Sequence, residues 1–171
     1  MASYSAPLRD MRFVYHELFD SSDISALPGF EEATPDLIDA VLEEAAKVCE
    51  NQLFPINRGG DEEGCRYHQG GEVTTPSGFR ECYRAYAEAG WIGLSSDPQY
   101  GGQGLPTAIS TLLEEMVCSS NIAFGTYVGL SRGAYRAIAA FGNDTLKTRY
   151  LPKLTSGEWS GTMCLTESQC G

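Results

Sequence analysis

The chain has 171 residues, and its composition of 42% hydrophobic and 20% charged residues is typical of a soluble globular domain. Its 23 acidic and 12 basic residues give a formal net charge of -11, which argues against nucleic acid and anionic membrane surfaces as partners. No run approaches the roughly 20 apolar residues of a membrane span, and residues 1–10 lack the apolar core of a signal peptide. We therefore expect neither membrane insertion nor secretion.

Two helices are predicted in the first third of the chain. Apolar residues recur at three- and four-residue steps within 8–19, up to Leu18 and Phe19, which favours a short helix with one buried face. Thr34 and Pro35 then supply an N-cap and a first-turn proline, a strong helix start. We expect this helix to end at Pro55. Its predicted apolar stripe is Leu37, Val41, Ala45, Val48 and Leu53, with Asp39, Glu43, Glu44 and Lys47 facing away.

The middle of the chain is rich in glycine and alternates loops with helices. Residues 58–74 are predicted to form an exposed loop, with a small hairpin that turns at 69–71. A third helix is expected from Thr75 to a left-handed cap at Gly90. Its inward residues are predicted to be Phe79, Cys82, Tyr83 and Tyr86. The glycines in 98–106 predict a tight loop that passes close to another backbone.

Three helices and a strand are predicted in the last part of the chain. The helices span 106–119, 121–141 and 143–153, and the second has small and apolar residues nearly all round, so we expect it to be buried on several sides. Residues 159–166 alternate small and large side chains as a strand does. A strand with almost nothing after it lacks a pairing partner, which indicates an incomplete chain.

The cysteines and histidines do not predict a metal site. The six cysteines are scattered without paired spacing, and most lie in apolar surroundings, as free buried thiols in a reducing cytoplasm do. Cys65 and His68 have half of a zinc-ligand spacing, but no second pair follows at a usable distance. His68 is expected at the surface. His16 is expected to pack or to be exposed, because no partner can be named for it.

Four motifs in order resemble the acyl-CoA dehydrogenase family: Gly-Trp-Ile-Gly-Leu at 90–94, the loop at 98–105, the two long helices, and Met-Cys-Leu-Thr-Glu at 163–167. The opening residues 6–13 and 27–30 are similar to the subgroup with an N-terminal extension, which includes the 3-methylthiopropanoyl-CoA dehydrogenases. The resemblance implies an all-α fold, the N-terminal helical domain of the family, followed by an incomplete first strand of its middle β-domain. The expected divisions are an extension at 1–33, the helical domain at 34–158, and a truncated β-domain at 159–171.

The resemblance also implies a chemistry for the parent protein. Enzymes of the family desaturate an acyl-CoA thioester with FAD and pass electrons to an electron-transferring flavoprotein, within fatty acid metabolism. Their carboxylate base comes from the C-terminal domain, so no catalytic residue is assigned here, and we expect the chain alone to be inactive and not to retain FAD. The Thr166 hydroxyl and the backbone around Leu165 would hydrogen-bond the flavin ring. The cofactor contacts carried over are Met163, Cys164, Leu165, Thr166 and Gly171. Ser168 stands where the family has proline, which leaves this loop freer.

The helices at 106–119 and 121–141 would form one wall of the acyl pocket. The nearest candidates for contact with the substrate are Glu114, Glu115 and Met116, although adjacent acidic residues on a helix are more often a solvated face. The family commonly forms homo-oligomers, and apolar surface left uncovered on this chain predicts self-association. The alternative function is a non-enzymatic helical module of the same ancestry, which acts in assembly or partner binding.

Overall fold

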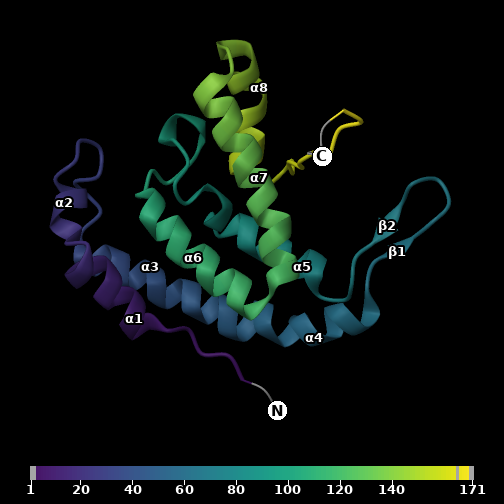
Figure 1. The fold of residues 1–171 in the computed structure, drawn as a ribbon, viewed down its shortest axis with the longest axis horizontal. Helices are drawn as coiled ribbons and strands as arrows, with labels where there is room; N and C mark the ends of the chain where they lie inside the picture. Colours follow the sequence, from purple (N-terminus) through teal and green to yellow (C-terminus); the bar gives the residue numbers. More distant parts are fainter. Residues whose placement is uncertain (1–2, 165, 170–171) are drawn as a thin grey trace.

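A computed structural model describes residues 3–164 and 166–169. The fold is helical, as the sequence predicts (Figure 1). The strands of the described residues are β1 (Arg66–Tyr67) and β2 (Val73–Thr74), which pair antiparallel. Within this part of the chain no helix has both the length and the apolar character needed to cross a membrane.

Within the described residues, eight α-helices follow one another in chain order. They are α1 (Leu8–Arg12), α2 (Ser21–Ser25), α3 (Pro35–Val48), α4 (Phe54–Glu63), α5 (Phe79–Glu88), α6 (Thr107–Ser120), α7 (Ile122–Phe141) and α8 (Asp144–Thr155). Short helical turns join them: the π turns η1 (Phe13–Leu18) and η2 (Cys49–Leu53), and the 3-10 turns η3 (Trp91–Gly93) and η4 (Pro98–Tyr100). In Figure 1, α3 and α4 run end to end, α6 lies beside α3, and α7 rises from the end of α6 to meet α8.

The start of α3 is as predicted, and its buried face is as predicted in part: Ala45 and Leu53 are buried, and Val41 and Val48 pack partly buried against the core. Oγ1 of Thr34 accepts a hydrogen bond from the N–H of Leu37 at 3.3 Å, and Pro35 occupies the first turn. Leu37, predicted to be buried, is 40% exposed, and the buried line lies one position further along the sequence. It consists of Ile38, Leu42, Ala45, Ala46 and Cys49. The sequence contains two adjacent apolar lines, and contact with α6 decides which one is buried.

The prediction that Pro55 ends this helix is wrong. The chain continues through η2 into α4, where Pro55 occupies the first turn. Proline removes one backbone hydrogen bond at this junction, and the π turn η2 lies directly before it in the continuous helix. The helix therefore also includes residues 58–63, which were expected to belong to an exposed loop. The carbonyl oxygen of Leu53, at the end of η2, accepts a hydrogen bond at 3.1 Å from Asn121.

The hairpin and the glycine conformations agree with the sequence. Tyr67 pairs with Val73, and Gly70 and Gly71 turn the hairpin with φ of 98° and 91°. The third helix, α5, begins later than predicted and its last residue is Glu88. Gly90, which follows the C-cap Ala89, has a φ of 79° and is left-handed as expected.

The glycine-rich loop passes against another stretch of backbone, as the sequence predicts. A Cβ added at Gly102 would lie 2.0 Å from the carbonyl oxygen of Ser96, so this position tolerates no side chain. The loop is tight because of this contact.

The core lies between α3, η2, α5, α6 and the first half of α7, and a smaller cluster joins α7 to α8. The expected burial of α7 on several sides is wrong for the described chain, because Ile122 is 61% and Phe141 is 91% exposed. Helices α6 and α8 pack against α7, while Thr126, Tyr127, Arg136 and Ala137 along its length are exposed. In the N-terminal segment Leu18 and Phe19 are exposed, whereas Met11 of α1 and Tyr15 of η1 are buried and Leu8 packs partly buried against the core.

Candidate functional site

The C-terminal segment leaves α8, returns to α7, and is fixed at three alternate residues. The Tyr83 hydroxyl donates to the carbonyl oxygen of Gly157 at 2.8 Å. The N–H of Trp159 donates to a carbonyl in the last turn of α8 at 3.1 Å. The N–H of Gly161 donates at 3.0 Å to Oγ of Ser131, a buried residue of α7. The residues that follow at 162–164 are exposed.

The strand predicted at 159–166 does not form in the part of the segment that is described. Residues 159–164 have no regular secondary structure, and Leu165 lies outside the described residues. A strand requires a second strand to accept and donate its backbone hydrogen bonds. Here the N–H of Gly161 is taken by a serine side chain of a helix instead.

The predicted cofactor contacts lie beyond this anchor. Met163, Cys164 and Thr166 are exposed, whereas Leu165 and Gly171 lie outside the described residues. The hydroxyl of Thr166 offers one donor and an acceptor. A segment of this kind is chemically able to hold a planar polar ring through its edge.

The predicted pocket-wall residues have three different environments. Oε2 of Glu114 forms an ion pair at 3.0 Å with Nη1 of Arg132, which also lies 3.4 Å from the carbonyl oxygen of Ser110. Glu115 is exposed, and Met116 is fully buried in the core. Consecutive helical residues point about 100° apart, so one wall cannot present all three equally. Their contact with an acyl group stays a prediction.

Arg132 is a residue that the sequence reasoning missed. Its side chain is 19% exposed, and its ion pair with Glu114 links α7 to α6. The signal was available, because Arg132 is one of few charged residues in the otherwise small and apolar stretch 121–141. Such a residue in a packed helix needs a partner.

A groove of about 890 Å³ lies between α4, the hairpin, α5 and the start of α7. Phe79, Tyr83, Ile122 and Tyr127 form its apolar wall, and the rings of Tyr83 and Tyr127 meet edge to face with centroids 5.1 Å apart. Arg80 and Tyr83 also line a neighbouring hollow of about 670 Å³, which reaches the end of α8. Aromatic walls with a few charged groups suit an apolar molecule. The sequence reasoning placed Phe79 and Tyr83 inward and missed the groove.

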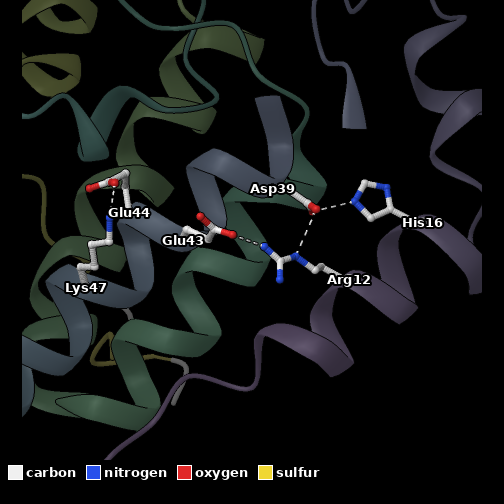
Figure 2. A network of polar contacts seen from close by, with 6 residues as sticks. All are labelled: Arg12, His16, Asp39, Glu43, Glu44 and Lys47. Carbon is white, nitrogen blue, oxygen red and sulfur yellow. Dashed lines mark hydrogen bonds and ion pairs between the residues drawn. The ribbon is translucent and has the colours of Figure 1, made fainter. Parts of the chain in front are cut away.

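A polar network fastens the N-terminal segment to α3 (Figure 2). Nε of Arg12 lies 3.2 Å from Oδ2 of Asp39, and its Nη2 donates to Oε1 of Glu43 at 2.5 Å. Nδ1 of His16 lies 2.9 Å from Oγ of Ser21, and its Nε2 lies 3.0 Å from Oδ1 of Asp39. His16 packs edge-on against Tyr15, which is one of the two expected environments, and the structure supplies partners that the sequence could not name. Its acidic partner was expected to face away and lies 23 positions along the chain.

The sulfur and imidazole groups of the described residues lie apart from one another. Within residues 3–164 and 166–169, no group of three or more His, Cys, Asp or Glu side chains could hold a metal ion. His68 is exposed, and its Nε2 lies 2.8 Å from Oγ1 of Thr74. The described cysteines are free, but Cys65 and Cys164 are exposed rather than in apolar surroundings. Cys49 is buried, and this burial raises the pKa of its thiol to about 12.

The family model for the acyl-CoA dehydrogenase N-terminal domain matches residues 36–158, which include α3 to α8 and the groove. The chain belongs to the acyl-CoA dehydrogenase family. It is 37% identical over 169 residues to the 3-methylmercaptopropionyl-CoA dehydrogenase of Ruegeria pomeroyi. This match covers 99% of the chain and 29% of that protein, so the chain spans less than a third of the relative's length.

Solved structures support the acyl-CoA dehydrogenase fold. Butyryl-CoA dehydrogenase from Megasphaera elsdenii matches with a TM-score of 0.63 at 20% identity, over 80% of this chain and 33% of that one. The electron transferring flavoprotein structure of Acidaminococcus fermentans matches with a TM-score of 0.64 at 22% identity, over 78% and 32% of the two chains. At these identities the likeness concerns the fold alone.

Proposed function

We propose that this chain is the N-terminal helical domain of an FAD-dependent acyl-CoA dehydrogenase, and that it forms one side of the site in which an acyl-CoA thioester is desaturated. The observation that carries the proposal is the exposed segment at 162–164, which leads from an anchor on α7 toward Thr166 in a chain of this family.

The exposed residues of this segment fit a flavin. Thr166 is exposed and is proposed to direct its hydroxyl toward the ring, and Met163, 59% exposed, offers apolar surface. Neutral hydrogen-bonding groups of this kind orient a flavin and adjust its electronics, while the cofactor itself accepts the hydride. The backbone of Leu165 is proposed as a further contact. Gly171 completes the proposed set.

The acyl group is proposed to lie against α6 and α7, near Glu114, Glu115 and Met116. Glu114 already pairs with Arg132 at 3.0 Å, so we assign it to the wall and not to proton abstraction. A general base must reach the proton that it removes, and in this proposal the base comes from another part of the protein. The chain alone is therefore expected to be inactive.

The proposed partners follow from the family and from the uncovered surface of α7. We propose an electron-transferring flavoprotein as the electron acceptor, a homo-oligomeric parent enzyme, and a cytoplasmic role in fatty acid metabolism. Ile122 and Phe141, which lie uncovered at the two ends of α7, favour self-association of the chain when it is isolated. A non-enzymatic partner-binding module would use the same exposed side chains, and flavin binding separates the two functions.

The test is a fluorescence titration of FAD, with visible absorption spectra, on the 171-residue chain and on a natural polypeptide that includes it together with the remainder of the parent. We expect no binding by the chain and stoichiometric binding by the longer protein. Thr166→Val in the longer protein should weaken binding, whereas Thr162→Val, at an exposed position nearer the anchor, should not. A longer protein that binds no flavin contradicts the proposal and favours the non-enzymatic module.

A further inference from the structure

We infer that Ser131 and Gly161 are positioning residues, which together fix where the segment bearing Met163, Cys164 and Thr166 leaves the helical domain. The inference rests on the proposed function, because it assigns a task to residues beside the proposed flavin contacts. Neither residue touches the flavin in this scheme. They act by holding the backbone that precedes it.

Gly161 packs against α7 so closely that no side chain fits. A Cβ added at this position would lie 2.5 Å from Cβ of Ala134 and 3.3 Å from Cα of Ser131. Both atoms belong to a long helix whose backbone cannot easily yield. The close approach brings the Gly161 N–H within 3.0 Å of Oγ of Ser131, which is only 4% exposed. The close packing of Gly161 on α7 and its hydrogen bond to Ser131 thus fix the segment in the same position.

Two residues before Gly161, Gly157 and Trp159, are also held in place by contacts with the helical domain. Gly157 has a φ of 74°, and a Cβ there would lie 2.4 Å from Cδ1 of Ile92. The ring of Trp159 packs on Tyr150 with centroids 5.8 Å apart. The pair formed by Ser131 and Gly161 is the anchor nearest to the exposed residues 162–164.

The anchor limits the space that Thr166 can reach. At roughly 3.4 Å per residue, the stretch from 161 to 166 spans at most about 17 Å, whereas a stretch that starts at the previous anchor, Trp159, spans about 24 Å. For a flexible chain this longer stretch raises the accessible volume roughly twofold. Losing the hydrogen bond as well should weaken flavin binding by about threefold to tenfold.

The experiment compares Ser131→Ala and Gly161→Ala in the natural polypeptide that includes the remainder of the parent. FAD affinity should fall by about threefold to tenfold for Ser131→Ala and by more for Gly161→Ala, with a shifted flavin absorption band in both. Two matched controls should keep the wild-type affinity and spectrum. Ser110→Ala removes a hydroxyl from an equally buried position on α6, and Gly133→Ala adds a Cβ on α7 where nothing lies within 4 Å.

A second measurement tests the anchor without flavin. Hydrogen exchange of the Gly161 amide in the 171-residue chain should quicken about tenfold in Ser131→Ala while the urea midpoint stays close to that of Ser110→Ala. Unchanged exchange overturns the inference. The inference is also overturned if the wild-type parent binds flavin and both anchor variants bind it with the same affinity and spectrum. That outcome leaves the proposed function intact. A wild-type parent that binds no flavin refutes the proposed function, and the exchange result then decides the anchor alone.

Discussion

Asn121 joins distant parts of the fold, and its replacement by alanine should cost more than the loss of an ordinary helix cap. The residue is 1% exposed. Its Oδ1 accepts from the N–H of Phe124 at 3.1 Å, as the N-cap of α7. Its Nδ2 donates at 3.1 Å to the carbonyl oxygen of Leu53, 68 positions earlier in the chain.

The two lost hydrogen bonds set the magnitude. Removal of an N-cap side chain costs about 1 kcal/mol. A buried carbonyl that loses its donor adds about 1 to 3 kcal/mol, so the free energy of unfolding should fall by roughly 2 to 4 kcal/mol. For a domain of this size each kcal/mol lowers Tm by roughly 2 to 4 °C. Asn121→Ala should therefore melt roughly 4 to 16 °C below the wild type.

The assay is urea unfolding followed by far-ultraviolet circular dichroism, with Asn143→Ala as the matched control. Asn143 caps α8 by accepting from the N–H of Leu146 at 3.0 Å, but it is exposed, so its loss should cost only about 1 kcal/mol. Asn121→Asp keeps the cap and places an acceptor against the Leu53 carbonyl, and should be less stable than Asn121→Ala. Equal losses for the two alanine variants would refute the assigned role of the buried carbonyl.

Four further outcomes are expected. Gly102→Ala should destabilise the fold by several kcal/mol, since its Cβ would lie 2.0 Å from a carbonyl oxygen. Gly133→Ala should slightly raise Tm in a thermal melt, because nothing lies within 4 Å of the added Cβ and alanine favours a helix over glycine. Burial raises the pKa of Cys49 from 9.0 to about 12, so the stability contributed by its protonated thiol is present below pH 9 and is lost as pH rises toward 12. The free energy of unfolding, measured with urea across that window, should fall because of this thiol by at most about 1.4 kcal/mol per pH unit. In Cys49→Ala the free energy of unfolding should fall less steeply with pH. Asp39→Asn weakens the contacts to Arg12 and His16, so trypsin should cut after Arg12 faster, with little change in Tm.

Much of the local structure was predictable because it depends on neighbouring residues. The N-cap at Thr34, the left-handed glycine at Gly90 and the hairpin turn at Gly70 each follow from the conformational freedom or hydrogen bonding of a few adjacent residues. The helical class and the likeness to the acyl-CoA dehydrogenases were predictable for the same reason, since ordered motifs along the chain carried them. The exposed places of Met163 and Thr166 agree with their proposed role without testing it.

Contacts between distant segments decided the rest. Helix α6 selects which of two adjacent apolar lines of α3 is buried, and a π turn lets the helix continue through Pro55. The pairing of Arg132 with Glu114 and the anchoring of Gly161 by Ser131 join residues 18 and 30 positions apart. By itself the sequence determined where helices begin, where glycine bends the chain, and which family it resembles. Only the tertiary structure decided which faces are buried and which charges meet, because those energies depend on segments that folding brings together.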